Sequence, residues 1–152
     1  MSTFHPHSRL TGCLSAAADA TERLRVNVQR DGMVTVLRVG GDIDLTNVAA
    51  WRCVLAEVSA VATAPGALII DLDAAHFLGL CAFTALADTA EHCRGRGIDL
   101  RVVGTQPVVA RIIGVGLWDT LLPVHATVVA AVDAWHQIHR PTGDAVANSQ
   151  GS

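Results

Sequence analysis

The 152-residue sequence contains no lysine, and all 11 of its basic residues are arginines. Acidic side chains outnumber them, so the formal net charge is −3 at pH 7. A protein that follows a phosphate backbone usually carries an excess of basic residues, because neutralising phosphates supplies much of the binding free energy. The composition therefore argues against a nucleic acid as the partner.

Long hydrophobic runs are missing as well. Uninterrupted apolar stretches, such as Ala67–Ile70, have the length of a strand, far below the ~18 residues that a membrane-spanning helix needs. The first ten residues, MSTFHPHSRL, lack the basic-then-apolar order of a secretory signal. We therefore expect a cytoplasmic protein that does not insert directly into a membrane.

No common metal or nucleotide motif is present. The four cysteines, at positions 13, 53, 81 and 93, form no CxxC pair, which argues against structural zinc. His136 and His139 can share one helix face, but no acidic or thiol partner is evident beside them. Neither GxGxxG nor GxxxxGK[ST] occurs. We expect no metal site and no cofactor, and reduced thiols in a cytoplasmic chain.

Apolar residues are what the chain has in abundance: 51% of it is hydrophobic and only 16% is charged. This length and composition suit one compact domain with a genuine core, as a monomer or weak dimer. Residues 1–21 show no steady period and predict a flexible arm. Residues 139–152 are polar and predict a frayed tail, which leaves the domain over residues 22–138.

The hydrophobic pattern predicts alternating strands and helices. Residues 24–30 alternate as in a half-buried strand, and Asp31-Gly32 is a strong hairpin signal before a second strand over 33–41. Helical spacing begins at Val48, with Thr46 or Asn47 as the N-cap. Further strands are predicted over 67–73, 98–104 and 118–124, and further helices from Leu80 to Arg94, from Pro107 and after Thr127. This order predicts an α/β fold with a small mixed sheet that opens on a β-hairpin.

Two carboxylates, Asp42 and Asp44, follow the second predicted strand. They could form a general acid/base pair, but the simpler interpretation is a strand-end turn in which Asp44 meets backbone amides near a helix start. No nucleophile with a base and an orienting group can be assembled from the chain, so we do not expect an enzyme.

The cysteines on the predicted helices are candidates for redox chemistry. Cys81 falls in a first helical turn, where free N–H groups and the helix dipole stabilise a thiolate, although its apolar neighbours in LGLCAF favour simple packing. Cys93 lies about 18 Å further along the same helix, too far for a disulfide with Cys81. If the two helices pack side by side, Cys53 on the first one is predicted to approach either Cys81 or Cys93.

Three segments in sequence order resemble the STAS domain, the family of bacterial anti-sigma-factor antagonists. GGDIDLTNVAAWRCVL resembles the family's G-E-I-D element, and LIIDLDAAHFLGLCAFTAL resembles its L-V-x-D-L-S…D-S-S-G-L element. RGRGIDLRVVGTQPVVARIIGVGLWDTLL is similar to the family's C-terminal pattern. The resemblance covers about residues 24–135 and implies a small sheet with helices mainly on one face.

The resemblance also implies a function. Members bind an anti-sigma factor, usually a serine kinase of the histidine-kinase-like ATPase type, and this frees the sigma factor. Phosphorylation of a serine at the start of the second helix switches the binding off, because a phosphate adds about −1.5 to −2 charges at the docking surface.

This sequence departs from the family at the switch. The D-S-S-G element aligns with Gly79-Leu80-Cys81-Ala82, so Cys81 replaces the phosphoacceptor and serine phosphorylation there is excluded. Thr84, one helical turn on, is the nearest hydroxyl and a weak substitute. Asp44 still matches the acidic residue of the G-E-I-D element.

We therefore expect a non-enzymatic regulator that docks on an anti-sigma factor, either constitutively or under control of thiol oxidation. An apolar turn in place of the serines also predicts an exposed hydrophobic patch, which suits a partner. Two alternatives remain open: a STAS subunit of a transporter or signalling assembly, and a sensor of a small ligand or nucleotide. The residues expected at the docking surface are Asp42, Asp44, Thr46, Leu78, Gly79, Leu80, Cys81, Ala82 and Phe83.

Overall fold

The computed structural model describes residues 24–139. The predicted arm over residues 1–21 and, apart from His139, the predicted tail over 139–152 lie outside this range. The elements follow the predicted order: β1 (Leu24–Asp31), β2 (Val34–Ile43), α3 (Val48–Val61), β3 (Gly66–Leu78), α4 (Leu80–Gly95), β4 (Ile98–Val103), α5 (Pro107–Val115), β5 (Val124–His125) and α6 (Val128–Ile138).

The strands form one mixed sheet in the order β1-β2-β3-β4-β5. β1 pairs antiparallel with β2, and every later pair is parallel. The hairpin turns at Gly32, whose φ of 64° lies in the left-handed region that glycine adopts without steric cost. The predicted α/β fold with an opening hairpin is thus confirmed.

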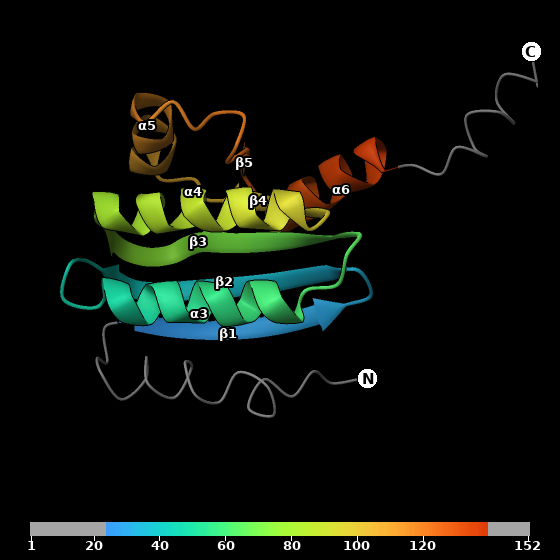
Figure 1. Cartoon of the computed structure of the whole chain (residues 1–152). Helices are drawn as coiled ribbons and strands as arrows, with labels where there is room; N and C mark the ends of the chain where they lie inside the picture. Colours follow the sequence, from blue (N-terminus) through green and yellow to red (C-terminus); the bar gives the residue numbers. More distant parts are fainter. Residues whose placement is uncertain (1–23, 140–152) are drawn as a thin grey trace, which may run out of the picture.

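Helices α3 and α4 lie side by side across one face of the sheet (Figure 1). Because side chains alternate along a strand, β2 turns Leu37 and Val39 towards these helices and Val36 to the opposite face. α5 adds Val109 and Ile113 to the same core as α3 and α4. α6 packs on the opposite face, where Trp135 joins Val36 and other buried residues, so the helices lie mainly on one face as expected.

β3 is longer than the sequence predicted. It continues past residue 73 to Leu78, because its backbone keeps pairing with β2 as far as Ile43 through two register shifts. The side chain of Gln106 supports the extension: its Nε2 donates to the carbonyl oxygens of Leu72 (3.2 Å) and Ala75 (3.1 Å). The extension carries Phe77 and Leu78 to the end of the sheet.

β5 is shorter than the sequence predicted. The strand expected over 118–124 is wrong except at its end, since only Val124 and His125 pair with β4. Leu117 has a φ of 60°, and the backbone N–H of Leu122 closes a turn on the carbonyl oxygen of Trp118 (2.7 Å). The apolar run of this segment therefore folds as turns, with Leu122 fully buried.

Candidate functional site

The loop between β2 and α3 is fixed by side-chain hydrogen bonds. The buried side chain of Asn47 accepts from the backbone N–H of Asp44 (2.9 Å) through Oδ1 and donates to the carbonyl oxygen of Asp42 (2.8 Å) through Nδ2. Asp44 Oδ1 in turn accepts from the backbone N–H of Thr46 (2.9 Å) and from its hydroxyl. The strand-end turn predicted for Asp44 is confirmed. Asn47 occupies the N-cap position, but its side chain binds this loop and not the amides of α3.

The start of α4 is tied to both neighbouring elements. The backbone N–H of Gly79, at the N-cap of α4, donates to the carbonyl oxygen of Ile43 at the end of β2 (2.9 Å). The indole N–H of Trp51 on α3 donates to the carbonyl oxygen of Ala82 (3.2 Å). Trp51 is fully buried, so the first turn of α4 has a fixed place relative to β2 and α3.

A groove of about 660 Å³ opens where the β2–α3 loop, the end of β3 and the start of α4 meet. Its surface is mainly apolar, and three large side chains at it are exposed to solvent: Leu45 (81%), Leu80 (63%) and Phe77 (54%). Asp44 supplies its only ionisable carboxylate among the described residues. We call this the docking groove; its lining residues are Asp44, Leu45, Thr46, Phe77, Gly79, Leu80, Cys81 and Thr84.

The structure brings most of the predicted docking residues together here. Three of the predicted residues do not line the groove, because their side chains are buried in the core: Leu78, Ala82 and Phe83. Asp42 lies beside the groove without lining it. Leu45 and Phe77 were not among the residues predicted at the docking surface, although a leucine inside a polar turn is a signal that could have indicated Leu45.

The two hydroxyls and the thiol at the groove differ in their surroundings. Thr46 is exposed, whereas Thr84 is half-buried and its hydroxyl donates back to the carbonyl oxygen of Leu80 (3.3 Å), a common arrangement within a helix. Cys81 is a half-buried free thiol. Thr84 therefore remains the hydroxyl nearest in sequence to Cys81, the position of the family's serine, and its O–H group already donates a hydrogen bond.

The states of the other two cysteines in the described range, Cys53 and Cys93, contradict two predictions made from the sequence. Cys53 is exposed on α3 and disulfide-bonded, while Cys81 and Cys93 are both free. The predicted pairing of Cys53 with Cys81 or Cys93 is therefore wrong, and so is the expectation that Cys53 is a reduced thiol. Cys93 is fully buried, and burial raises the pKa of its thiol to about 11 although the nearby Arg96 acts in the opposite direction. A thiol of this kind is inert.

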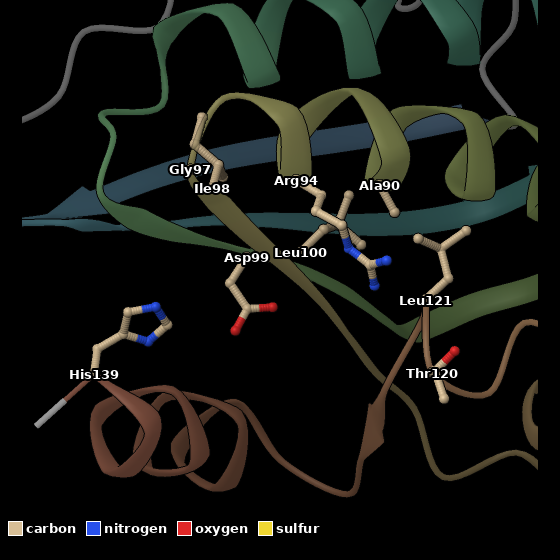
Figure 2. A pocket seen from close by; sticks show the side chains of 9 residues that line it. All are labelled: Ala90, Arg94, Gly97, Ile98, Asp99, Leu100, Thr120, Leu121 and His139. Carbon is tan, nitrogen blue, oxygen red and sulfur yellow. The ribbon is translucent and has the colours of Figure 1, made fainter.

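A second pocket, of about 240 Å³, lies between the end of α4, the start of β4 and the end of α6. Figure 2 shows Arg94 of α4, Asp99 of β4 and His139, which directly follows α6, around this pocket. None of the residues predicted at the docking surface lines this pocket. Among residues 24–139, no group of three or more histidine, cysteine or acidic side chains is arranged to hold a metal ion.

A buried arginine organises the sheet face beneath α6. Arg101 donates from Nε and Nη2 to Asp99 Oδ2 (3.1 and 3.0 Å), and its Nη1 lies 3.0 Å from His125 Nε2. Since a guanidinium only donates, His125 Nε2 acts as the acceptor. Burial lowers the pKa of His125, Arg101 lowers it further, and Asp99 partly opposes both.

The chain, with its docking groove at the carboxyl ends of β2 and β3, was compared with known proteins. The family model described as the STAS domain matches residues 25–131. This chain belongs to the STAS domain family. The match begins one residue inside β1, includes the other four strands in full and ends within α6.

Relatives of this STAS domain have consistent names. A candidate anti-anti-sigma factor of Mycobacterium tuberculosis, Rv2638, is 42% identical over 84% of this chain and 86% of its own length. The anti-sigma-F factor antagonist RsfA of the same species is 34% identical over 79% of this chain and 94% of its own length. These names describe regulators, in line with the prediction that the chain is not an enzyme.

Solved structures agree on the fold. An anti-sigma factor antagonist from Mycobacterium paratuberculosis superposes with a TM-score of 0.67 at 31% identity, covering 76% of this chain and 96% of that one. SpoIIAA in its unphosphorylated form superposes with a TM-score of 0.60 at 13% identity, covering 74% of this chain and 96% of that one, which supports the fold alone. No helix within residues 24–139 is long and apolar enough to cross a membrane.

Proposed function

We propose that this STAS domain is an anti-sigma-factor antagonist that binds an anti-sigma factor of the serine-kinase type through the docking groove. The observation that carries the proposal is the exposure of Leu45, Phe77 and Leu80 around one groove. Exposed apolar side chains gathered in one place are typical of a protein–protein contact. The family membership and the names of the relatives support an anti-sigma factor as the class of partner.

The proposed binding does not depend on serine phosphorylation. Cys81 stands at the groove where the resemblance places the phosphoacceptor serine, and a thiol cannot be a substrate for ordinary serine phosphorylation. The partner therefore meets an uncharged, apolar start of α4. Control of binding, where the cell exerts it, then has to act by other means, such as thiol chemistry.

The test is affinity measurement against the purified anti-sigma factors of the source organism. Leu80→Asp places a charge in the groove and is expected to weaken binding about tenfold or more, because a desolvated, unpaired carboxylate costs several kcal/mol. Leu117→Asp is the matched control, because Leu117 is equally apolar and 85% exposed but does not line the groove.

Unchanged affinity of the Leu80→Asp variant for every anti-sigma factor that the wild-type protein binds would overturn the assignment of the groove. Adding Mg²⁺ and ATP to a kinase-type partner should leave the complex intact, since Cys81 cannot accept a phosphoryl group as serine does. Loss of the complex together with phosphate on Thr84 would show instead that the neighbouring threonine has taken over the switch.

A small-ligand sensor is the second candidate function, and the groove itself favours it. A volume of about 660 Å³ with mainly apolar lining lies in the range of small-molecule sites. A ligand bound there would compete with the protein partner. Thermal-shift screening of apolar compounds, repeated on the Leu80→Asp variant, tests this candidate: stabilisation lost in the variant supports it.

A further inference from the structure

We infer that this STAS domain has a separate binding site for an elongated organic acid, on the sheet face that carries α6. The site is a cleft of about 440 Å³ between the β1–β2 hairpin and α6, and this volume lies in the range of small-molecule sites. We call it the hairpin cleft; its apolar lining consists of Met33, Val34, Val36, Val128, Val132 and Trp135. The inference is independent of the proposed function, because none of the residues that line the docking groove lines this cleft.

The indole N–H of Trp135 lacks an acceptor that a ligand can supply. Trp135 lines the cleft and is only 2% exposed, yet its buried Nε1 has no hydrogen-bond partner among the described residues. Buried polar groups are almost always hydrogen-bonded, because an unpaired buried donor costs free energy. The indole of Trp51, by contrast, has its acceptor in the carbonyl oxygen of Ala82. A ligand in the hairpin cleft that offers an oxygen atom to Trp135 removes this cost.

Neighbouring rings hold the indole of Trp135 in place. The ring of His139 stacks on it with the ring centroids 5.0 Å apart and an angle of 29° between the planes. The ring of His136 lies against it with a centroid distance of 4.9 Å. His139 is itself anchored, since its Nδ1 lies 3.1 Å from the carbonyl oxygen of Trp135. The N–H therefore keeps its direction, and an acceptor has to come to it.

Arg38 adds a positive charge with an unused donor to the cleft. Its Nη1 donates to Gln29 Oε1 (3.0 Å), and its Nε lies 3.7 Å from Asp71 Oδ2, which is too far for a hydrogen bond. Among residues 24–139, its Nη2 has no acceptor. The side chain lines the cleft and is 46% exposed. A guanidinium with N–H groups to spare is a preferred partner of a carboxylate.

The two donors lie towards opposite ends of the cleft. Arg38 follows Val34 by four positions on β2, which is about 13 Å along the strand. Trp135 lies towards the Val34 end, because His139 at the end of α6 shares a pocket with Asp99, and Asp99 lies in the same row of the sheet as Val34. Figure 1 agrees, since α6 ends (red) towards the end of the molecule where the β1–β2 hairpin turns.

These positions define the chemistry of the ligand. Its carboxylate belongs at Arg38, because Asp31 pairs with Val34 and lines the other end of the cleft, where it repels an anion. An uncharged oxygen belongs at the Trp135 end, where it accepts from the indole N–H. The body between them is apolar, since Val36 and the valines of α6 line the middle of the cleft. An aromatic acid with an ether or carbonyl oxygen at its far end has this pattern.

The test measures binding of a probe acid to the full chain by isothermal titration calorimetry. The probe is p-methoxycinnamate, which carries a carboxylate and an ether oxygen at opposite ends of a flat apolar body. Cinnamate lacks the ether oxygen, and anethole has a methyl group in place of the carboxylate. We expect each of these two to bind about fivefold to tenfold more weakly than the probe, as for the loss of one hydrogen bond.

Two variants test the two ends of the site separately. Trp135→Phe removes the indole N–H and should weaken binding of p-methoxycinnamate about fivefold to tenfold, with binding of cinnamate unchanged. Arg38→Gln removes the charge and should weaken binding of both acids about tenfold or more, with binding of anethole unchanged. Arg52→Gln is the matched control, because the Arg52 side chain is similarly exposed (48%) and is also paired with an aspartate, but it does not line the cleft.

Retained binding of cinnamate shows that the Trp135→Phe variant is folded. Wild-type protein that does not bind p-methoxycinnamate overturns the inference, and so does an Arg38→Gln variant that binds both acids as well as wild type does. Equal weakening of both acids by Trp135→Phe overturns the role given to the indole N–H. The Leu80→Asp variant should bind the probe normally. Loss of probe binding in that variant places the acid in the docking groove and overturns the hairpin cleft as its site.

Discussion

The indole Nε1 of Trp51 lies 3.2 Å from the carbonyl oxygen of Ala82 and donates a hydrogen bond to it. Trp51 belongs to α3, and Ala82 lies in the first turn of α4. The bond is buried, where a hydrogen bond is electrostatically stronger than in water. It therefore couples the loop that carries Asp44 and Leu45 to the helix start that carries Leu80 and Cys81, which are the two walls of the docking groove.

Trp51→Phe is expected to destabilise the domain by about 1–3 kcal/mol, because the Ala82 carbonyl oxygen loses its donor and a small void forms. Urea unfolding measures this as a lower midpoint with an unchanged slope. The same change at Trp118, which is only partly buried, serves as the control and should have a smaller effect. Equal midpoints for Trp51→Phe and wild type would show that the bond adds nothing to stability.

Asn47 is the organiser of the β2–α3 loop, and two variants separate its two hydrogen bonds. Asn47→Ala removes both and should cost about 1–3 kcal/mol, since the side chain is only 2% exposed. Asn47→Asp keeps the acceptor for the Asp44 N–H but places a carboxylate against the Asp42 carbonyl oxygen. We expect it to be at least as destabilising as alanine near pH 7 and to recover as the pH falls. An aspartate variant as stable as wild type at pH 7 would contradict this account of the loop.

His125 predicts a loss of stability on mild acidification. Burial and the neighbouring Arg101 lower the pKa of His125 below its ordinary value of 6.5, so the unfolded chain takes up a proton first as the pH falls. The contribution of neutral His125 to the free energy of unfolding is fully present above about pH 6.5. It is lost as the pH falls from there through the lower pKa of His125 in the folded state. His125→Gln cannot titrate, so its stability should change less over this interval. Unfolding midpoints from pH 7.5 to pH 5 check it, and parallel curves for both proteins would refute it.

The sequence predicted the order of elements well because its periodicity is strong, and it predicted the location of the groove because Gly79-Leu80-Cys81-Ala82 stands at a recognisable family position. Other features depend on contacts between distant residues. The extension of β3 rests on pairing with β2 and on hydrogen bonds from Gln106, the N-cap residue of α5, and nothing in the local sequence indicates either. Phe83 is buried because its side of α4 faces the core, whereas Phe77, near the end of β3, is exposed to solvent. The disulfide state of Cys53 could not be predicted, since cysteine spacing does not fix pairing.

The last prediction concerns the contrast between the two free thiols of α4. Cys93 is fully buried, and burial raises the pKa of its thiol to about 11, so only about one molecule in a thousand carries the thiolate at pH 8. Cys93→Ser buries a hydroxyl in an apolar site and should cost about 1–3 kcal/mol. Cys81→Ser, at the half-buried groove, should change stability by less than about 0.5 kcal/mol. Urea midpoints of the two variants test the contrast, and Cys93→Ala shows how much of the loss comes from the hydroxyl and not from the missing sulfur. If Cys93→Ser were as stable as Cys81→Ser, the site around Cys93 would have to admit water.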